Sequence, residues 1–208
     1  MQPIFIAGPH GSGKTTLIKT LSEKSKKFIV DDFKIDFSNE METLSVMTIF
    51  EKCLIRLYHR FYTAQLALQK CNDNKEEKFL LIDRSIYDSL VYINVEYQLG
   101  ELNEEQYIKL KEIGKNGIRM IEPYTVILNP NPKEIISRLS KRREMGIRKK
   151  RDILCKREDN IHYIEMMNSE FVKIYGNKNV IHVHDNKDED IELIYKWIDD
   201  CVLAKDKS

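Results

Sequence analysis

A glycine-rich stretch near the N-terminus constrains the fold of this chain more than any other feature of its sequence. Residues 4–21 read IFIAGPHGSGKTTLIKTL, so a short apolar run leads into three closely spaced glycines and then into an amphipathic segment. The apolar run predicts a buried strand, and the segment that begins at Lys14 predicts a helix. Gly8, Gly11 and Gly13 stand between them and permit a turn that is too tight for residues with a Cβ atom. We therefore expect a strand, a glycine loop and a helix.

The spacing of this loop, G-x-x-x-x-G-K-T, is specific when a strand precedes it and a helix follows it. Backbone N–H groups of such a loop point inward and bind phosphate, and the positive end of the helix dipole adds to the attraction. We expect Lys14 to reach the β- and γ-phosphates of ATP and the Thr15 hydroxyl to bind Mg²⁺. The predicted nucleotide-binding residues are Gly8, His10, Gly11, Ser12, Gly13, Lys14, Thr15 and Thr16.

The remainder of the chain alternates short apolar runs with helical patterns. Strands are predicted at residues 3–7, 28–30, 79–82, 124–128 and 180–184, and helices at 15–25, 42–69, 87–98, 103–120, 158–175 and 189–201, with a further helix from Pro132. This alternation predicts an α/β fold of the P-loop NTPase kind, with a parallel sheet covered by helices on both faces. Since the 208 residues contain no linker-like or repetitive segment, we expect a single P-loop domain that spans residues 1–208.

The composition excludes several classes of protein. The formal net charge of +1 gives the whole molecule no strong attraction to nucleic acid or to a membrane surface. No apolar run approaches the roughly 20 residues that cross a bilayer, and the sequence opens on a strand without a secretion signal. The four cysteines are too widely spaced for a metal site or a redox pair: Cys53, Cys71, Cys155 and Cys201. We therefore expect a cytoplasmic protein without membrane association.

Acidic residues follow two of the predicted strands. Asp31 and Asp32 follow the second strand, where a kinase needs a carboxylate to accept or orient the proton of the acceptor hydroxyl. Asp32 is the first candidate and Asp31 the second, and the alternative is a pair of solvated turn acids. The third strand ends in Asp83-Arg84-Ser85. An arginine directly after the acid suits contact with a phosphate or an acceptor better than activation of water.

A strongly basic segment follows the fourth predicted strand. Residues 138–157 read RLSKRREMGIRKKRDILCKR, in which ten of twenty residues are Lys or Arg, and Gly146 suggests a helix–loop–helix. Arg138 and Arg142 are four residues apart, so they share a helix face and can converge on one phosphate. One interpretation is a lid, at about residues 139–156, that closes over the triphosphate. The other is a basic face for nucleic acid or a solvated surface.

Together, these motifs resemble the thymidylate kinase and deoxynucleoside kinase group of P-loop kinases. The segment DRSIYDSLVY, residues 83–92, is similar to D-R-Y-x-x-S-x-x-A-Y of thymidylate kinases and, more directly, to D/E-R-S-[IV]-Y of deoxynucleoside kinases. Residues 122–144 are similar to the thymidylate kinase stretch P-D-L-T-x-x-L-x-x-x-P-x-x-x-x-x-R-x-x-x-R. The matching positions there are Pro123, Thr125, Pro132, Arg138 and Arg142.

The resemblance implies roles by position. Asp83 would help to hold Mg²⁺, Arg84 would contact the acceptor or its phosphate, and Arg138 and Arg142 would belong to the lid. The helix of residues 42–69 would form a wall of the acceptor site, with Gln65 as a candidate contact. Dimers are common in these families, so a homodimer is a possible assembly.

The sequence also departs from both families. His10 stands where thymidylate kinases usually carry an acid. Asp31-Asp32-Phe33 stands where those kinases carry R-E-P and deoxynucleoside kinases carry E-P. The aspartate pair looks more like the D-D-F of small kinases that act on a neutral hydroxyl, which favours a nucleoside or another alcohol as acceptor.

We therefore predict ATP-dependent, Mg²⁺-assisted phosphoryl transfer to a small-molecule acceptor, a nucleoside or nucleoside monophosphate. The predicted catalytic residues are Lys14, Asp32, Arg84, Arg138 and Arg142, and the predicted acceptor contacts are Asp31, Asp32, Arg84 and Gln65. One alternative is a kinase of a non-nucleotide alcohol or of a polynucleotide end, which the basic segment would serve. Another is a regulatory module that binds ATP and hydrolyses it slowly or not at all.

Overall fold

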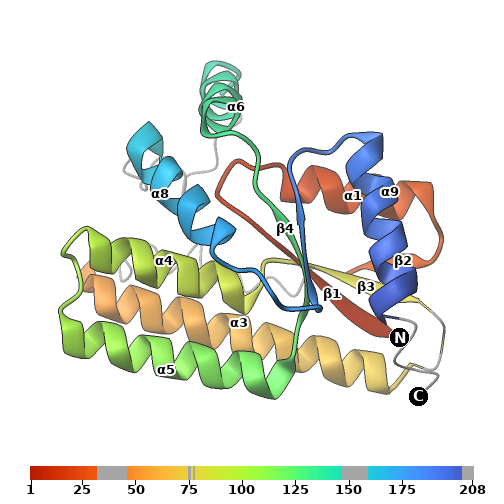
Figure 1. Cartoon of the computed structure of the whole chain (residues 1–208), viewed down its shortest axis with the longest axis horizontal. Helices are drawn as coiled ribbons and strands as arrows, with labels where there is room; N and C mark the ends of the chain where they lie inside the picture. The colour runs from red at the N-terminus through yellow and green to blue at the C-terminus, as the bar shows by residue number, and fades with distance from the viewer. Residues whose placement is uncertain (32–45, 75, 77, 147–158, 203–208) are drawn as a thin grey trace.

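A five-stranded parallel sheet forms the centre of the protein (Figure 1). The structure, a computed structural model, describes residues 1–31, 46–74, 76, 78–146 and 159–202. The strand order is β2-β3-β1-β4-β5, so the strand that precedes the glycine loop lies in the middle. The strands are β1 (Gln2–Ala7), β2 (Phe28–Val30), β3 (Phe79–Asp83), β4 (Tyr124–Leu128) and β5 (Val180–Val183).

Helices cover both faces of this sheet, which confirms the predicted α/β class. Alternate residues of β1 point to opposite faces. The helices are α1 (Lys14–Lys24), α3 (Ile49–Asn72), α4 (Ile86–Gln98), α5 (Glu104–Ile121), α6 (Pro132–Glu144), α8 (Ile161–Val172) and α9 (Asp188–Trp197), which a π-helical turn, η3 (Ile198–Val202), extends. Ile4 and Ile6 pack in a core with residues of α1 and α9 on one face, and Phe5 packs with residues of α3, α4 and α5 on the other.

The long helix α3 begins later than the sequence predicted. The apolar spacing of residues 42–69 indicated one continuous helix, of which residues 42–45 lie outside the described part of the chain. Thr48 has an extended backbone, and its Oγ1 accepts a hydrogen bond from the Glu51 N–H at 3.3 Å. Glu51 Oε2 in turn accepts the Thr48 N–H at 2.7 Å. This reciprocal capping box fixes the first turn at Ile49, although Met47 continues the apolar period.

Two glycines allow α5 to lie against its neighbours. A Cβ atom at Gly117 would lie 1.5 Å from the Phe61 ring of α3, and one at Gly114 would lie 2.4 Å from Leu90 Cδ2 of α4. Both positions therefore exclude larger residues because of close approach. The three helices α3, α4 and α5 run side by side below the sheet in Figure 1 and form one layer.

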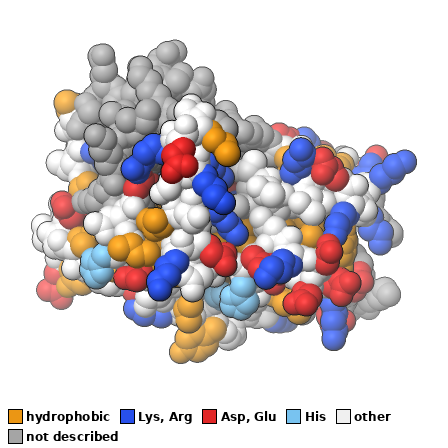
Figure 2. Space-filling view, turned by 90° about the horizontal axis from the view of Figure 1, so that it is seen from above, with side chains coloured by type: hydrophobic (Ala, Val, Ile, Leu, Met, Phe, Trp, Pro, Cys, Tyr) orange, Lys and Arg blue, Asp and Glu red, His pale blue; other side chains and the backbone are white. Residues whose placement is uncertain are grey.

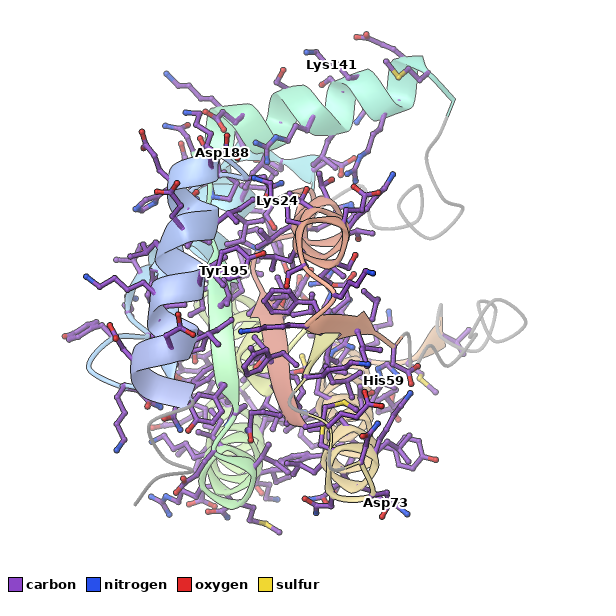
Figure 3. All side chains as sticks on the ribbon, turned by 90° about the vertical axis from the view of Figure 1, so that its right-hand side faces the viewer. Lys24, His59, Asp73, Lys141, Asp188 and Tyr195 are labelled. Carbon is purple, nitrogen blue, oxygen red and sulfur yellow. The ribbon has the colours of Figure 1, made fainter. Side chains whose placement is uncertain are left out.

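On the opposite face, α1 and α9 are fastened to each other and to the sheet. Lys24 of α1 forms an ion pair with Asp188 at the start of α9, and both side chains meet between the two helices in Figure 3. The Tyr195 ring of α9 lies 5.7 Å from the Phe28 ring of β2. These contacts matter for function because the glycine loop leads into α1 and the loop after β5 leads into α9.

Candidate active site

The glycine loop joins β1 to α1 at the carboxyl edge of the sheet, where ligands of parallel sheets bind. Gly8, Gly11 and Gly13 have φ angles of +146°, +81° and +104°. A Cβ atom at Gly8 would lie 2.2 Å from the carbonyl oxygen of Leu128 in β4. Glycine at these positions is therefore required both by the backbone conformation and, at Gly8, by the neighbouring strand.

Lys14 is buried inside the loop. Its Nζ donates hydrogen bonds to the carbonyl oxygens of Gly8 at 2.9 Å and Pro9 at 2.8 Å. Burial lowers the pKa of Lys14 from 10.5 to about 7, and the positive charges of Arg84 and Arg60 act in the same direction. Burial removes water from the Lys14 ammonium, and the residues that the structure describes supply no full countercharge. The group is therefore suited to bind an anion. A triphosphate placed in the loop would supply that charge.

Thr15 and Asp83 form the candidate Mg²⁺ site. Thr15 Oγ1 donates to Asp83 Oδ2 at 3.2 Å. The other carboxylate oxygen, Asp83 Oδ1, is buried and has no hydrogen-bond partner among the described residues. Mg²⁺ takes oxygen ligands and is held at phosphate-transfer sites by one or two protein groups together with substrate phosphates and water. A hydroxyl and a carboxylate with a spare buried oxygen fit that role, so the residues present suit the ion.

Arg84 lies directly after β3 in a strained backbone conformation. Its φ angle is +88°, in a region that non-glycine residues rarely adopt. Its N–H donates to the carbonyl oxygen of Ile6 at 2.9 Å, so the chain turns immediately beside β1. The guanidinium Nη1 donates to Asp88 Oδ1 at 3.2 Å. Strain of this kind persists where the surroundings impose it, often at functional sites.

The sequence reasoning missed Asp88, which is only 2 % exposed in the first turn of α4. Its Oδ2 accepts the Ser85 N–H at 2.8 Å. Its Oδ1 accepts both the Arg84 guanidinium and, at 3.3 Å, the N–H of Gly8. The pattern Ser85-x-x-Asp88, a helix-capping signature, was the available signal in the sequence.

Two further side chains contact the backbone of the glycine loop from distant elements. Arg138 of α6 donates through Nη1 to the carbonyl oxygen of Ser12 at 2.5 Å. Asn186, in the loop between β5 and α9, donates through Nδ2 to the carbonyl oxygen of Gly13 at 3.3 Å. The structure therefore brings the predicted Arg138 to the loop, and it adds Asn186, for which the sequence pattern gave no signal.

The other residues of the predicted nucleotide and lid sites occupy the expected elements. His10 is half-buried in the loop, Thr16 is exposed in the first turn of α1, and Arg142 is half-buried one turn beyond Arg138. Of the predicted lid, residues 139–146 form the end of α6 and the turn after it, and residues 147–156 lie outside the described part of the chain.

Of the predicted acceptor residues, Arg84 is linked to the glycine loop through Asp88. Asp31 forms an ion pair with Lys70 of α3, and Asp32 lies outside the described residues. Gln65 is exposed on α3, and its role as an acceptor contact stays a prediction.

Two arginines, Arg56 and Arg60, lie on a different face of α3 from Gln65. The Arg60 side chain is near enough to Lys14 for its charge to contribute to the lowered pKa of that lysine. One turn earlier, the Arg56 guanidinium lies 4.5 Å from the centre of the Tyr92 ring of α4. Arg56 of α3 and Tyr92 of α4 thus form a cation–π contact between the two helices.

A buried loop lysine, with arginines near it on α3, after β3 and on α6, suits phosphoryl transfer, and the fold places the chain among P-loop kinases. The particular branch follows from sequence comparison. The chain belongs to the deoxynucleoside kinase family, which it matches over residues 4–196. This confirms the deoxynucleoside kinase part of the resemblance; thymidylate kinases are a related but distinct group. No curated protein matches the sequence.

Solved structures with a similar fold include deoxyadenosine kinase from M. mycoides in three liganded forms. The form with the products dCMP and a flexible dCDP has 20% identity and a TM-score of 0.66, and the match covers 95% of this chain and 99% of that one. The form with dATP has 18% identity and a TM-score of 0.65, over 96% and 100%. The form with dCTP has 18% identity and a TM-score of 0.59, over 95% and 99%.

Proposed function

We propose that this protein transfers the γ-phosphoryl group of ATP to a hydroxyl of a deoxynucleoside. The observation that carries the proposal is the arrangement of Lys14, Asp83 and Arg84 at one edge of the sheet in a member of the deoxynucleoside kinase family. Lys14 and Asp83 suit the donor phosphates and their metal, and Arg84 suits the acceptor. Phosphoryl transfer depends mainly on such positioning and on charge stabilisation.

On the donor side, the loop N–H groups and the Lys14 ammonium would bind the β- and γ-phosphates. Thr15 and Asp83 would hold Mg²⁺, which neutralises charge on those phosphates when it is bound. Arg138 already contacts the Ser12 carbonyl, so a small movement of its guanidinium would bring it to a phosphate. Arg142, one turn further along α6, would belong to the same closing segment.

On the acceptor side, Arg84 would orient the reacting hydroxyl and stabilise the phosphate that forms on it. Of the two candidate carboxylates, Asp32 stays the first choice as the group that accepts the hydroxyl proton. Asp31 already has a countercharge, because its carboxylate is paired with Lys70. A carboxylate in an ion pair is a weaker base and less free to turn toward a substrate.

The ligands named for the M. mycoides enzyme guide the choice of acceptor. That protein was solved with dATP, with dCTP and with dCMP and dCDP, so both a purine and a pyrimidine deoxynucleotide are found on the same fold. Deoxyadenosine and deoxycytidine are therefore the first acceptors to test here. Deoxyguanosine, thymidine and the four monophosphates complete the panel.

The test is acceptor-dependent release of ADP in the presence of ATP and Mg²⁺, together with identification of the phosphorylated acceptor. Deoxynucleoside-stimulated turnover that is lost in Lys14→Ala supports the proposal. Lys19→Ala is the matched control because Lys19 lies on α1 with a side chain that is 74% exposed. ATP hydrolysis that no acceptor changes, or stimulation only by an alcohol outside the panel, would contradict the proposal.

A further inference from the structure

One buried carboxylate joins the glycine loop to the arginine on the acceptor side. Asp88 is the fifth residue after β3, on the first turn of α4, and it is only 2 % exposed. Its two oxygens meet three donors, the N–H groups of Gly8 and Ser85 and the guanidinium of Arg84. Gly8 is 80 residues away in the sequence, so the contact with the loop is a product of the fold.

We propose that Asp88 is a positioning residue that holds Arg84 at a fixed place relative to the glycine loop. Through this one side chain, the group that meets the acceptor and the loop that holds the donor phosphates are kept at a set separation. The inference rests on the proposed kinase function and adds a residue that never touches either substrate. In-line transfer requires that separation to be right, because small displacements of reacting groups are costly in rate.

The two oxygens of Asp88 separate this role from ordinary helix capping. Oδ2 accepts the Ser85 N–H at 2.8 Å and completes the capping box of α4. Oδ1 takes no part in the cap. It accepts the Gly8 N–H at 3.3 Å and the Arg84 Nη1 at 3.2 Å, which are both groups of the site.

The burial of this cluster explains why one carboxylate can fix Arg84. The side chain of Arg84 is 19% exposed and that of Asp88 is 2% exposed, so water screens their attraction little. The backbone of Arg84 is also restrained, with φ at +88° and its N–H bonded to Ile6 of β1. With the backbone set by β1 and the guanidinium set by Asp88, few rotamers remain open to the arginine.

Asp88→Asn is the informative variant because it changes one oxygen only. The remaining oxygen can still accept the Ser85 N–H and preserve the cap, while the new amide presents a donor to the two donors of Gly8 and Arg84. We expect kcat/KM for the deoxynucleoside to fall about 10- to 100-fold, as is typical when a supporting residue behind a reactive group is lost. Asp88→Glu keeps the charge and should recover part of that loss.

A matched control isolates the effect of capping. Gln106 occupies the same capping-box position in α5, where its N–H donates to Asn103 and its side chain accepts the Asn103 N–H. Gln106→Ala removes that side chain outside the site. We expect it to shift the unfolding midpoint at least as much as Asp88→Asn and to leave kcat/KM within about twofold.

A double variant tests whether Asp88 acts through Arg84. If it does, Arg84→Ala combined with Asp88→Asn loses no more activity than Arg84→Ala alone, because the two residues act as a unit. Multiplicative losses, or a wild-type kcat/KM in Asp88→Asn, would overturn the inference. The inference would also be overturned if Asp88→Asn lost activity only in proportion to its loss of folded protein, as a lower unfolding midpoint would cause.

The kinase proposal and this inference fail in different ways. If the wild type shows no deoxynucleoside-stimulated turnover, the proposed function is wrong. Binding of a fluorescent ATP analogue then still reports on the contact between Asp88 and the Gly8 N–H. In that assay, weaker binding by Asp88→Asn than by Gln106→Ala supports the connection to the loop, and equal binding contradicts it.

Discussion

The guanidinium of Arg138 donates to the carbonyl oxygen of Ser12 at 2.5 Å, which fastens α6 to the glycine loop across 126 residues of sequence. An ion pair with Glu134 one turn earlier, at 3.4 Å, holds the same side chain from its other side. These two contacts hold the Arg138 guanidinium beside the glycine loop.

Arg138→Ala should lower kcat by about 100-fold or more and weaken ATP binding less, because arginines at phosphoryl-transfer sites act mainly on transition-state charge. Steady-state kinetics with saturating acceptor and a separate ATP titration would measure the two effects. Lys133→Ala, an exposed residue of the first turn of α6, is the control and should behave as wild type. Weaker ATP binding with an unchanged kcat would mean that Arg138 acts on the ground state instead.

The lowered pKa of Lys14 predicts proton uptake when ATP binds. In the ligand-free protein this pKa is about 7, so above pH 7 the amine is mostly neutral. Bound phosphates favour the ammonium and raise the pKa, so ATP affinity should fall as pH rises from about 7.5 to 9, by at most about tenfold per pH unit. Titration calorimetry in buffers with different ionisation enthalpies would measure the proton uptake. Lys14→Met should bind ATP weakly and without this uptake.

The ion pair between Asp31 and Lys70 predicts different effects for two neighbouring aspartates. Asp31→Asn removes a carboxylate that is already engaged with Lys70, so kcat should stay within a few-fold of the wild type. Asp32→Asn should lower kcat by about 10²- to 10⁴-fold if it is the general base. Rapid-quench measurement of a single turnover would separate chemistry from product release. The reverse ranking would assign the base to Asp31.

The contact between Gly117 and Phe61 predicts a stability effect far from the site. Gly117→Ala places a methyl group where the Phe61 ring lies, at a Cβ distance of 1.5 Å, so the helices must separate. We expect the free energy of unfolding, measured by denaturant titration, to fall by about 1–3 kcal/mol.

Two companion variants check the cause of that loss. Lys115→Ala, at an exposed position of α5, should change the free energy of unfolding by less than about 0.5 kcal/mol. Phe61→Leu should relieve part of the loss caused by Gly117→Ala, since it removes the edge of the ring. If the double variant is instead the sum of the two single variants, the loss caused by Gly117→Ala does not depend on the Phe61 ring, and crowding against that ring is not its cause.

Local patterns explain which parts of the fold could be predicted. The strand before Gly8, the glycine loop and the alternation of strands and helices depend on residues close together in the sequence, and all three are confirmed. The start of α3 was placed too early because Met47 fits the apolar period, whereas the capping box of Thr48 and Glu51 decides the boundary.

Contacts between distant residues explain what could not be predicted at the site. Asp88 and Asn186 meet the glycine loop only after the sheet has assembled, and their own neighbours in the sequence do not indicate the loop. The exposed placement of Gln65 likewise depends on how α3 packs, which its neighbours in the sequence do not indicate. Figure 2 shows positively and negatively charged side chains interspersed over the face near α6. Most of the basic residues of the segment 138–157 lie outside the described part of the chain. Within the described ranges, no helix has the length and apolar character needed to cross a bilayer.

The long sequence separations around the glycine loop also bear on how the protein is made. The loop leaves the ribosome before the residues that bind its carbonyl and N–H groups. These residues are Asp88, Arg138 and Asn186, the last of them 173 residues after its partner Gly13. A nascent chain therefore carries the nucleotide motif long before it carries the groups that shape it. Binding of nucleotide during translation should begin only after Asn186 has left the exit tunnel, so the loop becomes competent long after it is synthesised.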